Sequence, residues 1–479
     1  TGIVHFFTDN TVQNGRTYYY ALVAYDYGAP EIEPGIAPSE NEIVIEKNEA
    51  EEVTAYGKNI QIVVPRTTAS GYTPAQIKMD TTGVRFGSGR IVPSILAEAS
   101  LKEGHEYKLK FMVDTLYTVS EYDHGFTYHN NGLAVYDMTD HNTLVYSETP
   151  KHYAYNNLVY KDTLGYWIFN QNGPFSTDIF DGINLTLASI PLKASYNYEK
   201  SGWLTGSANI RITLTSVETG YFPWDYDIVF TDNPAAYTGR VLNKTTIRNE
   251  ANARITPSSL LLTGQNFSFY VLNKSFMNAD GSYEKMDLVV QDLDKDGTFN
   301  MLKDRILVGP LNKKGWWAGT AFIIDFNNVA DQANLPKPND VYRMTFTRPY
   351  MATDSVTLKI LPQGEVNKAQ ISYNMANIKV VPNPYVATNS MEPSVSNWQL
   401  NQRRRLMFTH LPAQCTIKIF TMSGVMIDEL DVQNDAANGM AQWDLKTSEG
   451  LEIAAGVYVF YVKSDLTGDT FMGKFAVVK

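Results

Sequence analysis

The strongest β-strand pattern in this chain is Gly456-Val457-Tyr458-Val459-Phe460-Tyr461-Val462-Lys463. Both of its alternating faces are apolar or aromatic, which is typical of a central strand covered on two sides. Apolar and polar residues largely alternate in Cys415-Thr416-Ile417-Lys418-Ile419-Phe420, which predicts a strand with one buried face. Hairpin turns that require a positive φ are expected at Ser423-Gly424 and at Asn438-Gly439. Together these patterns predict an immunoglobulin-like sandwich over residues 378–479.

The rest of the chain has a composition that also favours β structure. There are 30 Tyr and 22 Phe among 479 residues, and Gly, Asn, Asp and Thr recur between short apolar runs. With 44% hydrophobic residues the chain can bury ample core, and its length indicates about three domains. We therefore predict an all-β fold of tandem β-sandwich domains, immunoglobulin-like or jelly-roll-like.

The charge and cysteine content narrow the function. A formal net charge of −11 disfavours broad nucleic-acid binding, which needs a basic footprint, and gives no attraction to anionic membranes. No apolar run of about eighteen residues occurs, so no transmembrane segment is expected. The single cysteine, Cys415, shares a strand face with Ile417 and Ile419, which predicts a core thiol rather than a nucleophile.

The first residues suggest part of a domain. Residues 14–26 resemble the late strands of a fibronectin type III domain, with Tyr18 or Tyr19 as its corner tyrosine, and residues 39–45 look like its final strand. A complete domain of this fold needs about a hundred residues. Residues 1–46 are therefore expected to be the tail of such a domain, and the absence of a signal peptide fits that expectation. The alternative is a hairpin that packs on the next domain.

The middle region is predicted to be almost entirely strands. One β-sandwich is expected over residues 51–245 and a second over residues 256–362, with the boundary in a mostly polar stretch. Residues 93–102 are the one notable helix candidate, because Pro93 stands where a first-turn proline is tolerated. Residues 363–377 are predicted to be a linker.

Residues 378–479 carry short motifs in a fixed order, which include Leu411-Pro412 and Trp443-Asp444-Leu445. Further residues of this pattern are Pro382, Asn383, Pro384, Gly424, Gly456, Tyr458, Gly473, Lys474 and Lys479. Through these residues the stretch resembles the C-terminal sorting domain of proteins exported by the type IX secretion system of Bacteroidota-like bacteria. An immunoglobulin-like spacer of a secreted enzyme is the alternative.

The resemblance implies an address for export. In that family the domain directs the protein across the outer membrane, and it is often removed or used for surface attachment. It implies an extracellular or cell-surface location, with the type IX secretion machinery or a surface anchor as partner. Other surface proteins and glycans are further candidate partners, and cleavage or retention of the domain stays open.

One acidic loop has the pattern of a calcium site. Carboxylates alternate in Asp292-Leu293-Asp294-Lys295-Asp296-Gly297, and the glycine suits a sharp turn. The twelfth position holds Lys303, where an EF-hand has a bidentate glutamate, so Asp304 would have to close the site. The predicted ligands of a Ca²⁺ ion are Asp292, Asp294, Asp296, Thr298, Asn300 and Asp304. The alternative is a solvated acidic β-turn.

No catalytic motif is present. None of the seven histidines has the spacing of a zinc-protease helix, and His124 and His129 are interpreted as ordinary loop residues. A nucleophile elbow, a phosphate-binding loop and a dinucleotide fingerprint are all missing. We predict no catalytic residue and no enzymatic activity.

Two kinds of carbohydrate contact are considered. Trp203, Trp316-Trp317, Tyr153-Ala154-Tyr155 and Phe222-Pro223-Trp224-Asp225-Tyr226 could form sugar-binding platforms if they are exposed, although core packing explains most aromatic residues. Surface proteins of the lineage that the sorting domain suggests are often O-glycosylated after aspartate. The matching positions are Thr81, Thr115, Thr163 and Ser355.

The sequence thus predicts a non-catalytic structural or adhesive portion of a large secreted or cell-surface protein. Its C-terminal domain would serve type IX export or surface attachment. Two rival interpretations are the accessory C-terminal half of a secreted peptidase or glycoside hydrolase, and a glycan-binding module.

Overall fold

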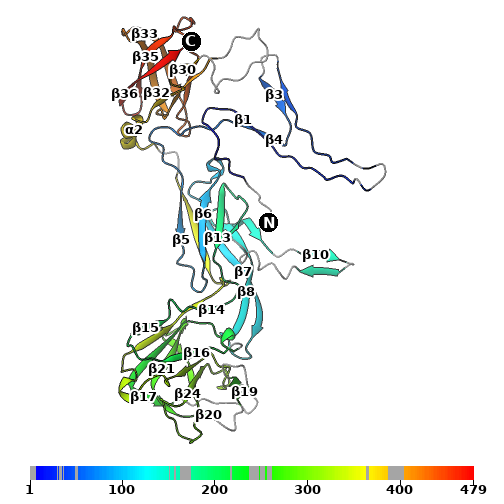
Figure 1. The fold of residues 1–479 in the computed structure, drawn as a ribbon, viewed down its shortest axis with the longest axis vertical. Helices are drawn as coiled ribbons and strands as arrows, with labels where there is room; N and C mark the ends of the chain where they lie inside the picture. The colour runs from blue at the N-terminus through cyan, green and yellow to red at the C-terminus, as the bar shows by residue number, and fades with distance from the viewer. Residues whose placement is uncertain are drawn as a thin grey trace. The chain divides into compact units, whose positions relative to one another are not determined.

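The computed structural model describes residues 7–29, 31, 35, 37–48, 52–149, 152–155, 158–161, 174–215, 218–236, 247–248, 254–255, 261–362, 366–386 and 404–478. The chain forms two compact units, Thr1–Gln76 with Pro362–Lys479 and Ile77–Leu361, and each is considered by itself (Figure 1). Almost all regular structure among the described residues is β-strand in packed sheets, which confirms the all-β, β-sandwich prediction. None of the described helices has the length and apolar character needed to cross a membrane.

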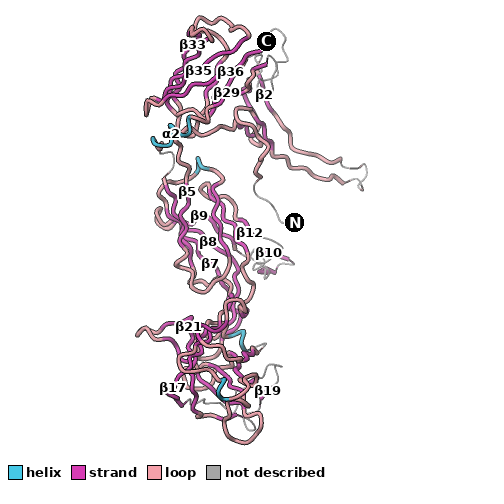
Figure 2. The backbone as a smooth tube through the Cα atoms, turned by 60° about the vertical axis from the view of Figure 1, so that its left-hand side comes forward, coloured by secondary structure: helices cyan, strands magenta, loops and turns pink. Residues whose placement is uncertain are grey.

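A sandwich of two sheets forms the C-terminal part of the first unit. One sheet has the order β29 (Lys379–Val381), β31 (Leu406–Thr409) and β34 (Ala441–Trp443). The other has the order β30 (Tyr385–Val386), β36 (Thr470–Val478), β35 (Gly456–Ser464), β32 (Gln414–Thr421) and β33 (Met426–Gln433). Figure 1 labels these five strands, and β33, β35 and β36 are labelled again in Figure 2. Leu406 and Trp443 from the first sheet pack with Ile417 and Phe460 from the second, so the core lies between the sheets.

Two expectations about this sandwich hold and one does not. Cys415 is buried in the core, and burial raises the pKa of its thiol to about 12, which leaves it inert near neutral pH. Gly424 has φ +86 in the turn between β32 and β33, as expected. Gly439 does not have a positive φ, and its small size serves a close contact instead, because an added Cβ would lie 2.3 Å from the Thr68 carbonyl oxygen. A glycine can be required either by a positive φ in a turn or by the close approach of two backbones, and the sequence does not distinguish these two causes.

The expected linker of residues 363–377 contains a helix. The helix α2 (Lys368–Met375) begins after Asn367, whose side chain accepts a hydrogen bond from the Ala369 backbone. Ile371 and Met375, one helical turn apart, are buried in the core of the C-terminal sandwich. Only the face of α2 that carries Ile371 and Met375 is buried, so the rest of the segment can be polar. This polar composition is why the sequence predicted a linker.

The N-terminal strands of the first unit form two small sheets. β1 (Tyr18–Ala21) pairs with β4 (Ile60–Val63), and β2 (Ile45–Lys47) pairs with β3 (Val53–Tyr56). The β1–β4 pair joins residues on both sides of the boundary expected at residue 46. Of the hydrophobic side chains that the structure describes, none before Ile60 is buried. The strands β1, β2 and β3 therefore bury no hydrophobic side chain, and Ile60 at the start of β4 is the first that is buried.

The second unit contains one sandwich built from both ends of its sequence. Its larger sheet has the order β5 (Gln76–Asp80), β28 (Ser355–Leu361), β7 (Glu106–Thr118), β8 (Phe126–Asp137) and β9 (Thr143–Glu148). Its smaller sheet has the order β12 (Phe175–Ser176), β13 (Ile183–Ala188) and β6 (Arg90–Ile95). Leu109 and Leu358 from the larger sheet share a core with Leu185 from the smaller one.

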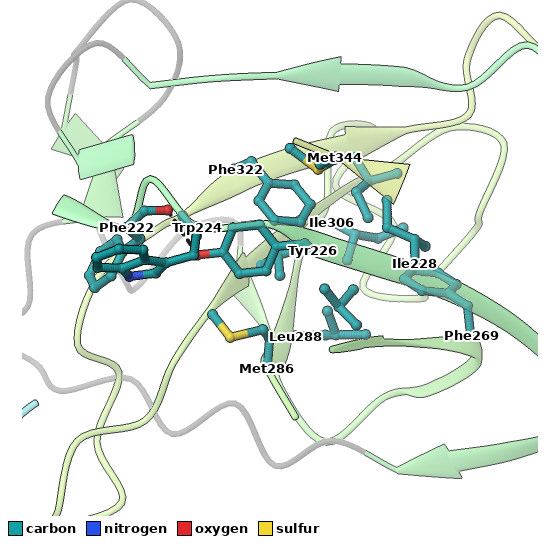
Figure 3. Packing of buried hydrophobic residues seen from close by; sticks show 14 of the residues in the cluster. Phe222, Trp224, Tyr226, Ile228, Phe269, Met286, Leu288, Ile306, Phe322 and Met344 are labelled. Atoms are coloured by element: carbon teal, nitrogen blue, oxygen red, sulfur yellow. Dashed lines mark hydrogen bonds between the residues drawn. The ribbon is translucent and has the colours of Figure 1, made fainter. Parts of the chain in front are cut away.

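A second sandwich in this unit has two five-stranded sheets. The first has the order β15 (Gly202–Thr205), β26 (Val341–Met344), β17 (Tyr226–Ala236), β21 (Asn266–Met277) and β22 (Tyr283–Lys285). The second has the order β16 (Arg211–Thr213), β25 (Phe322–Asp325), β24 (Arg305–Gly309), β23 (Asp287–Gln291) and β20 (Leu261–Leu262). Tyr226 and Phe269 from one sheet pack with Ile306 and Phe322 from the other (Figure 3).

The strand pairing divides this unit differently from the sequence. β17 pairs with β21, so strands on both sides of the expected boundary at residues 245–256 share one sheet. The chain leaves the first sandwich along β14 (Ser195–Tyr196) and returns along β27 (Phe346–Thr347), which pairs with β14, before it enters β28. The polar stretch itself contains the short hairpin of β18 (Ile247–Arg248) and β19 (Arg254–Ile255). Polar composition marks any connection between strands and cannot distinguish a hairpin from a domain boundary.

The prediction of a helix over residues 93–102 is wrong. Residues 90–95 form β6, which pairs with β13 at the edge of its sheet, and only a short 3-10 turn, Glu98–Ser100, follows. Pro93 is compatible with this strand because an edge strand can leave one backbone donor position unused. Pairing with β13 therefore outweighed the local helix propensity.

Candidate functional site

The acidic loop joins two buried strands of the second sandwich. β23 ends at Gln291 and β24 begins at Arg305, so both ends of the loop are fixed by one sheet. Oxygen atoms of Asp292, Asp294 and Asp296 all lie within 4.8 Å of one another. This arrangement could hold a metal ion, because three carboxylates at this spacing can share one hard cation.

The other predicted ligands stabilise the loop. The Asp304 carboxylate is fully buried, and its two oxygens accept hydrogen bonds from the backbone of Leu293 at 3.0 Å and of Asn300 at 2.7 Å. The Asn300 side chain accepts from the Leu302 backbone at 3.0 Å, and both donors of Thr298 point to Asp296. The structure therefore brings together three of the six predicted ligands and gives Asp304 and Asn300 the role of anchors.

Asp292 is both a possible metal ligand and an anchor of the loop backbone. It is only 4% exposed, and its two oxygens accept hydrogen bonds from the backbone of Lys295 at 2.6 Å and of Gly297 at 2.9 Å. Lys295 and Gly297 have φ values of +63° and +77°, which curl the backbone around this carboxylate. The loop is thus shaped by its own backbone hydrogen bonds before any cation is considered.

A lysine already neutralises part of this cluster. The ammonium of Lys303 lies 2.9 Å from the Asp294 carboxylate, and this hydrogen bond lowers the pKa of Asp294. The same contact raises the pKa of Lys303. Because the lysine side chain is 57% exposed, it can leave the cluster at little cost. The loop therefore carries an internal competitor for any metal ion that would use Asp294.

Distant parts of the sorting-domain pattern meet at one edge of the C-terminal sandwich. The Asn383 side chain donates to the Lys474 carbonyl oxygen at 3.3 Å and accepts from the Ala476 backbone at 3.1 Å. The next residues enter β30, in which Tyr385 pairs parallel with Val477 of β36. The segment Pro382-Asn383-Pro384 is therefore joined to the final strand although about ninety residues separate them in sequence.

The remaining pattern residues divide into structural and exposed positions. The Tyr458 hydroxyl donates to the Ala454 carbonyl oxygen at 2.7 Å, and its ring stacks on Phe475. Gly456 pairs with Val477 in the β35–β36 register. A Cβ at Gly473 would lie 2.4 Å from the ring of Phe460, so only glycine fits there. Lys474 is exposed, and Lys479 lies outside the described residues.

The positions considered for O-glycosylation differ in exposure. Thr81 and Thr115 are exposed, whereas Ser355 is half-buried at the start of β28. The preceding Asp354 is fully buried, and its oxygens accept hydrogen bonds from the backbone of Arg85, Phe86, Gly87 and Met351. Thr163 lies outside the described residues.

Most aromatic residues considered for sugar binding belong to the core. Phe222, Trp224 and Tyr226 are fully buried (Figure 3). Trp317 is 2% exposed. Trp203 is half-buried, with its indole N–H donated to the Ala208 carbonyl oxygen at 2.9 Å. Trp316 is half-buried too, and the side chains of Tyr153 and Tyr155 lie outside the described residues. Residues 222–226 therefore do not form an exposed platform.

The sequence did not suggest a polar cluster around Glu284. Its carboxylate accepts hydrogen bonds from the Tyr122 hydroxyl at 2.8 Å and from the Asn273 amide at 3.0 Å, and His124 Nδ1 lies 3.4 Å away. Burial, together with the Glu284 charge, holds the pKa of Tyr122 far above its ordinary value. The cluster fixes the turn between β7 and β8 on the second sandwich. Its members are too far apart in sequence for a local pattern to reveal it.

Comparisons with known proteins give only distant likenesses. No family model matches the chain, and no curated protein matches it. PorZ, a bacterial surface component of the type IX secretion system of Porphyromonas gingivalis, is similar at 13% identity with a TM-score of 0.19, over 80% of this chain and 54% of PorZ. Latent PorU from the same organism is 11% identical with a TM-score of 0.15, over 86% of this chain and 34% of PorU.

A third solved structure, the BSP domain of a biofilm-associated protein, is similar at 9% identity with a TM-score of 0.16. That alignment covers 87% of this chain and 83% of the domain. TM-scores this low do not establish a shared fold.

Proposed function

We propose that this chain is a non-catalytic structural and adhesive portion of a large secreted or cell-surface protein. Residues 378–479 would direct type IX export or attach the protein to the cell surface. The observation that carries the proposal is the contact of Asn383 with Lys474 and Ala476, because it joins the two ends of the sorting-domain pattern into one surface.

The joined surface suits recognition by another protein. Gly473 packs against the ring of Phe460 and fixes the path of β36, while the neighbouring Lys474 side chain is exposed. Among the ion pairs of the described residues, none involves the Lys474 ammonium. An exposed, unpaired cation next to a rigid strand is available to a partner protein.

The acidic loop adds a proposed Ca²⁺ site with a stabilising role. Asp292, Asp294 and Asp296 supply oxygen ligands, which Ca²⁺ prefers, and the loop joins two strands of a buried sheet. An ion that binds only the folded state would raise the stability of this sandwich. It would thereby support a structural rather than a catalytic role.

A matched pair of lysine variants tests the export role. Lys474→Gln and Lys463→Gln each remove one exposed positive charge from the same sheet, but only Lys474 belongs to the sorting-domain pattern. We expect Lys474→Gln to lower the amount of protein on the cell surface and in the medium severalfold, and to raise the amount inside the cell. Lys463→Gln is expected to match the unmodified protein. Equal surface amounts for the two variants and the unmodified protein would contradict the role proposed for Lys474.

A further inference from the structure

A cavity of about 490 Å³ opens in the first sandwich of the second unit, beside β5 and β6. Its volume lies within the range of about 300–1,000 Å³ that is typical of small-molecule sites. The chain segment Gly87-Ser88-Gly89-Arg90-Ile91 forms one wall, and Lys200 contributes from the segment before β15. The cavity is distinct from the acidic loop and from the sorting-domain surface, and the sequence did not suggest it.

The charge of this cavity is opposite to that of the whole protein. Arg90 and Lys200 line it, and no aspartate or glutamate does, although the formal net charge is −11. In the part of the chain that the structure describes, neither cationic side chain has a hydrogen-bonded or ion-paired partner. Both side chains are exposed at the opening and are available to an anionic ligand. Positive charges inside an acidic protein create a local preference for anions.

The cavity also has an apolar side. Tyr350 and Val356 are buried at its base, and Val84 is half-buried beside them. The Tyr350 ring is fixed in place because it stacks on Phe111 with centroids 4.1 Å apart. Gly87 lets the wall lie directly on this ring, since a Cβ there would be 2.1 Å from a Tyr350 ring carbon. A rigid apolar base beside cations suits a ligand that carries both a C–H face and a negative charge.

The glycine-rich wall does not form a phosphate cradle. Such a cradle needs free backbone N–H groups, as in a phosphate-binding loop. Here the Gly87 N–H donates to the Asp354 carboxylate at 2.8 Å, and the Ser88 N–H donates to the Arg348 carbonyl oxygen at 2.8 Å. Anion recognition therefore falls to Arg90 and Lys200. An arginine fork beside an ammonium matches the two oxygens of a carboxylate.

We propose that this cavity binds a sugar acid, that is, a pyranose ring bearing a carboxylate, such as a hexuronic acid of an acidic glycan. Arg90 and Lys200 hold the carboxylate, Thr81 of the lining supplies a hydroxyl for a ring hydroxyl, and the apolar base receives the C–H face. The Ser88 hydroxyl already accepts a hydrogen bond from the Arg348 backbone at 3.2 Å. This inference deepens the adhesive role proposed above and rests on it, because it supplies the ligand class for adhesion.

The test compares two methyl glycosides that differ at one carbon. Methyl α-glucuronide carries a carboxylate where methyl α-glucoside carries a hydroxymethyl group, so their difference isolates the recognition of charge. We expect calorimetric titration of the full chain to show binding of the glucuronide, weakened by added salt, and no measurable binding of the glucoside. Arg90→Gln and Lys200→Gln should each weaken glucuronide binding about tenfold, which is the usual effect of losing one charged hydrogen bond.

The control is Lys193→Gln, which removes the same charge at an exposed lysine that does not line the cavity, and it should bind like the unmodified chain. Unchanged circular dichroism of the two cavity variants would show that they remain folded. The inference is overturned if the glucuronide does not bind, if the glucoside binds equally well, if inorganic phosphate binds more tightly, or if the Lys193 variant loses as much affinity as the cavity variants. A negative result for glucuronide binding would not bear on the proposed surface location, because that location is measured separately on cells.

Discussion

The Lys303 ammonium lies 2.9 Å from the Asp294 carboxylate, within the group of aspartates that could hold a metal ion. The loop thus contains a cation of its own, in the position where an EF-hand has its last acidic ligand. Any divalent ion that uses Asp294 must displace this lysine or accept its repulsion. The affinity of the loop for Ca²⁺ should therefore depend on residue 303.

Removal of that lysine should strengthen Ca²⁺ binding. We expect Lys303→Gln to raise the affinity roughly tenfold, because a positive charge next to the ion costs on the order of 1 kcal/mol or more near a surface. The measurement is the increase in melting temperature with Ca²⁺ relative to a chelator, since an ion bound to the folded state alone raises stability. Lys295→Gln is the control, because Lys295 is exposed in the same loop and makes no ion pair with Asp294. A Ca²⁺-dependent shift that is no larger in Lys303→Gln than in Lys295→Gln would contradict the competition.

Two other aspartates of the loop should respond differently to substitution. Asp304→Asn would place an amide N–H₂ against the backbone N–H of Leu293 or Asn300, and a buried donor without an acceptor costs about 1–3 kcal/mol. This loss should appear in urea unfolding even with a chelator present. Asp296→Asn, at an exposed position, should leave the stability without Ca²⁺ almost unchanged and remove the Ca²⁺-dependent increase. Equal effects of the two variants would show that Asp304 does not act as an anchor.

The contact between the two sandwiches of the second unit should depend on Arg348. This residue is 3% exposed, and its guanidinium pairs with both oxygens of Asp225 at 3.0 and 2.9 Å and donates to the Phe86 carbonyl oxygen at 3.1 Å. Arg348→Met should lower the free energy of unfolding by about 3 kcal/mol, because it leaves Asp225 and buried carbonyl oxygens without their partner.

The control for this effect is a second bidentate pair, which joins the neighbouring strands β26 and β17 of the second sandwich. Arg343 binds both oxygens of Asp227 at 2.7 Å, but its side chain is 39% exposed, so Arg343→Met should cost about 1 kcal/mol or less. Urea unfolding followed by tryptophan fluorescence measures both values. A loss for Arg343→Met as large as that for Arg348→Met would show that burial is not the deciding factor.

Alkaline pH should destabilise the second unit. Burial raises the pKa of Tyr350 to about 12, and burial also raises the pKa of Tyr107 and Tyr128 well above their ordinary values. An unfolded tyrosine ionises near pH 10, so the folded state binds more protons than the unfolded state above that value. The stability is therefore fully present below about pH 10 and falls as pH rises further. Tyrosinate absorbance should increase together with the loss of near-ultraviolet circular dichroism, and full ionisation with that signal intact would contradict the burial.

Local patterns in the sequence predicted those features that depend on neighbouring residues. Strand alternation gave the β fold class, and the spacing of Asp292, Asp294 and Asp296 placed three carboxylates together because a single tight loop carries them. Features that depend on distant partners were missed. Gly439 has its role through Thr68, and the cavity at Arg90 requires Lys200 from another part of the chain.

The errors have the same origin. Residues 93–102 have local helix propensity, yet pairing of β6 with β13 makes residues 90–95 a strand. The composition of residues 363–377 suggested a linker, yet two side chains of α2 complete the core of the C-terminal sandwich. In each case the tertiary partner decided the structure, and a single sequence without its partner contacts could not supply it.

The proposed role requires the protein to lie outside the cell, and proteolysis of intact cells measures this location most directly. Protease is added to intact cells of the organism that makes the protein, and peptides from residues 77–361 are quantified by mass spectrometry, with lysed cells for comparison. We predict that protease treatment of intact cells, with the medium included, releases as much of these peptides as treatment after lysis. Peptides that appear only after lysis would place the chain inside the cell and contradict its proposed role as part of an exported surface protein.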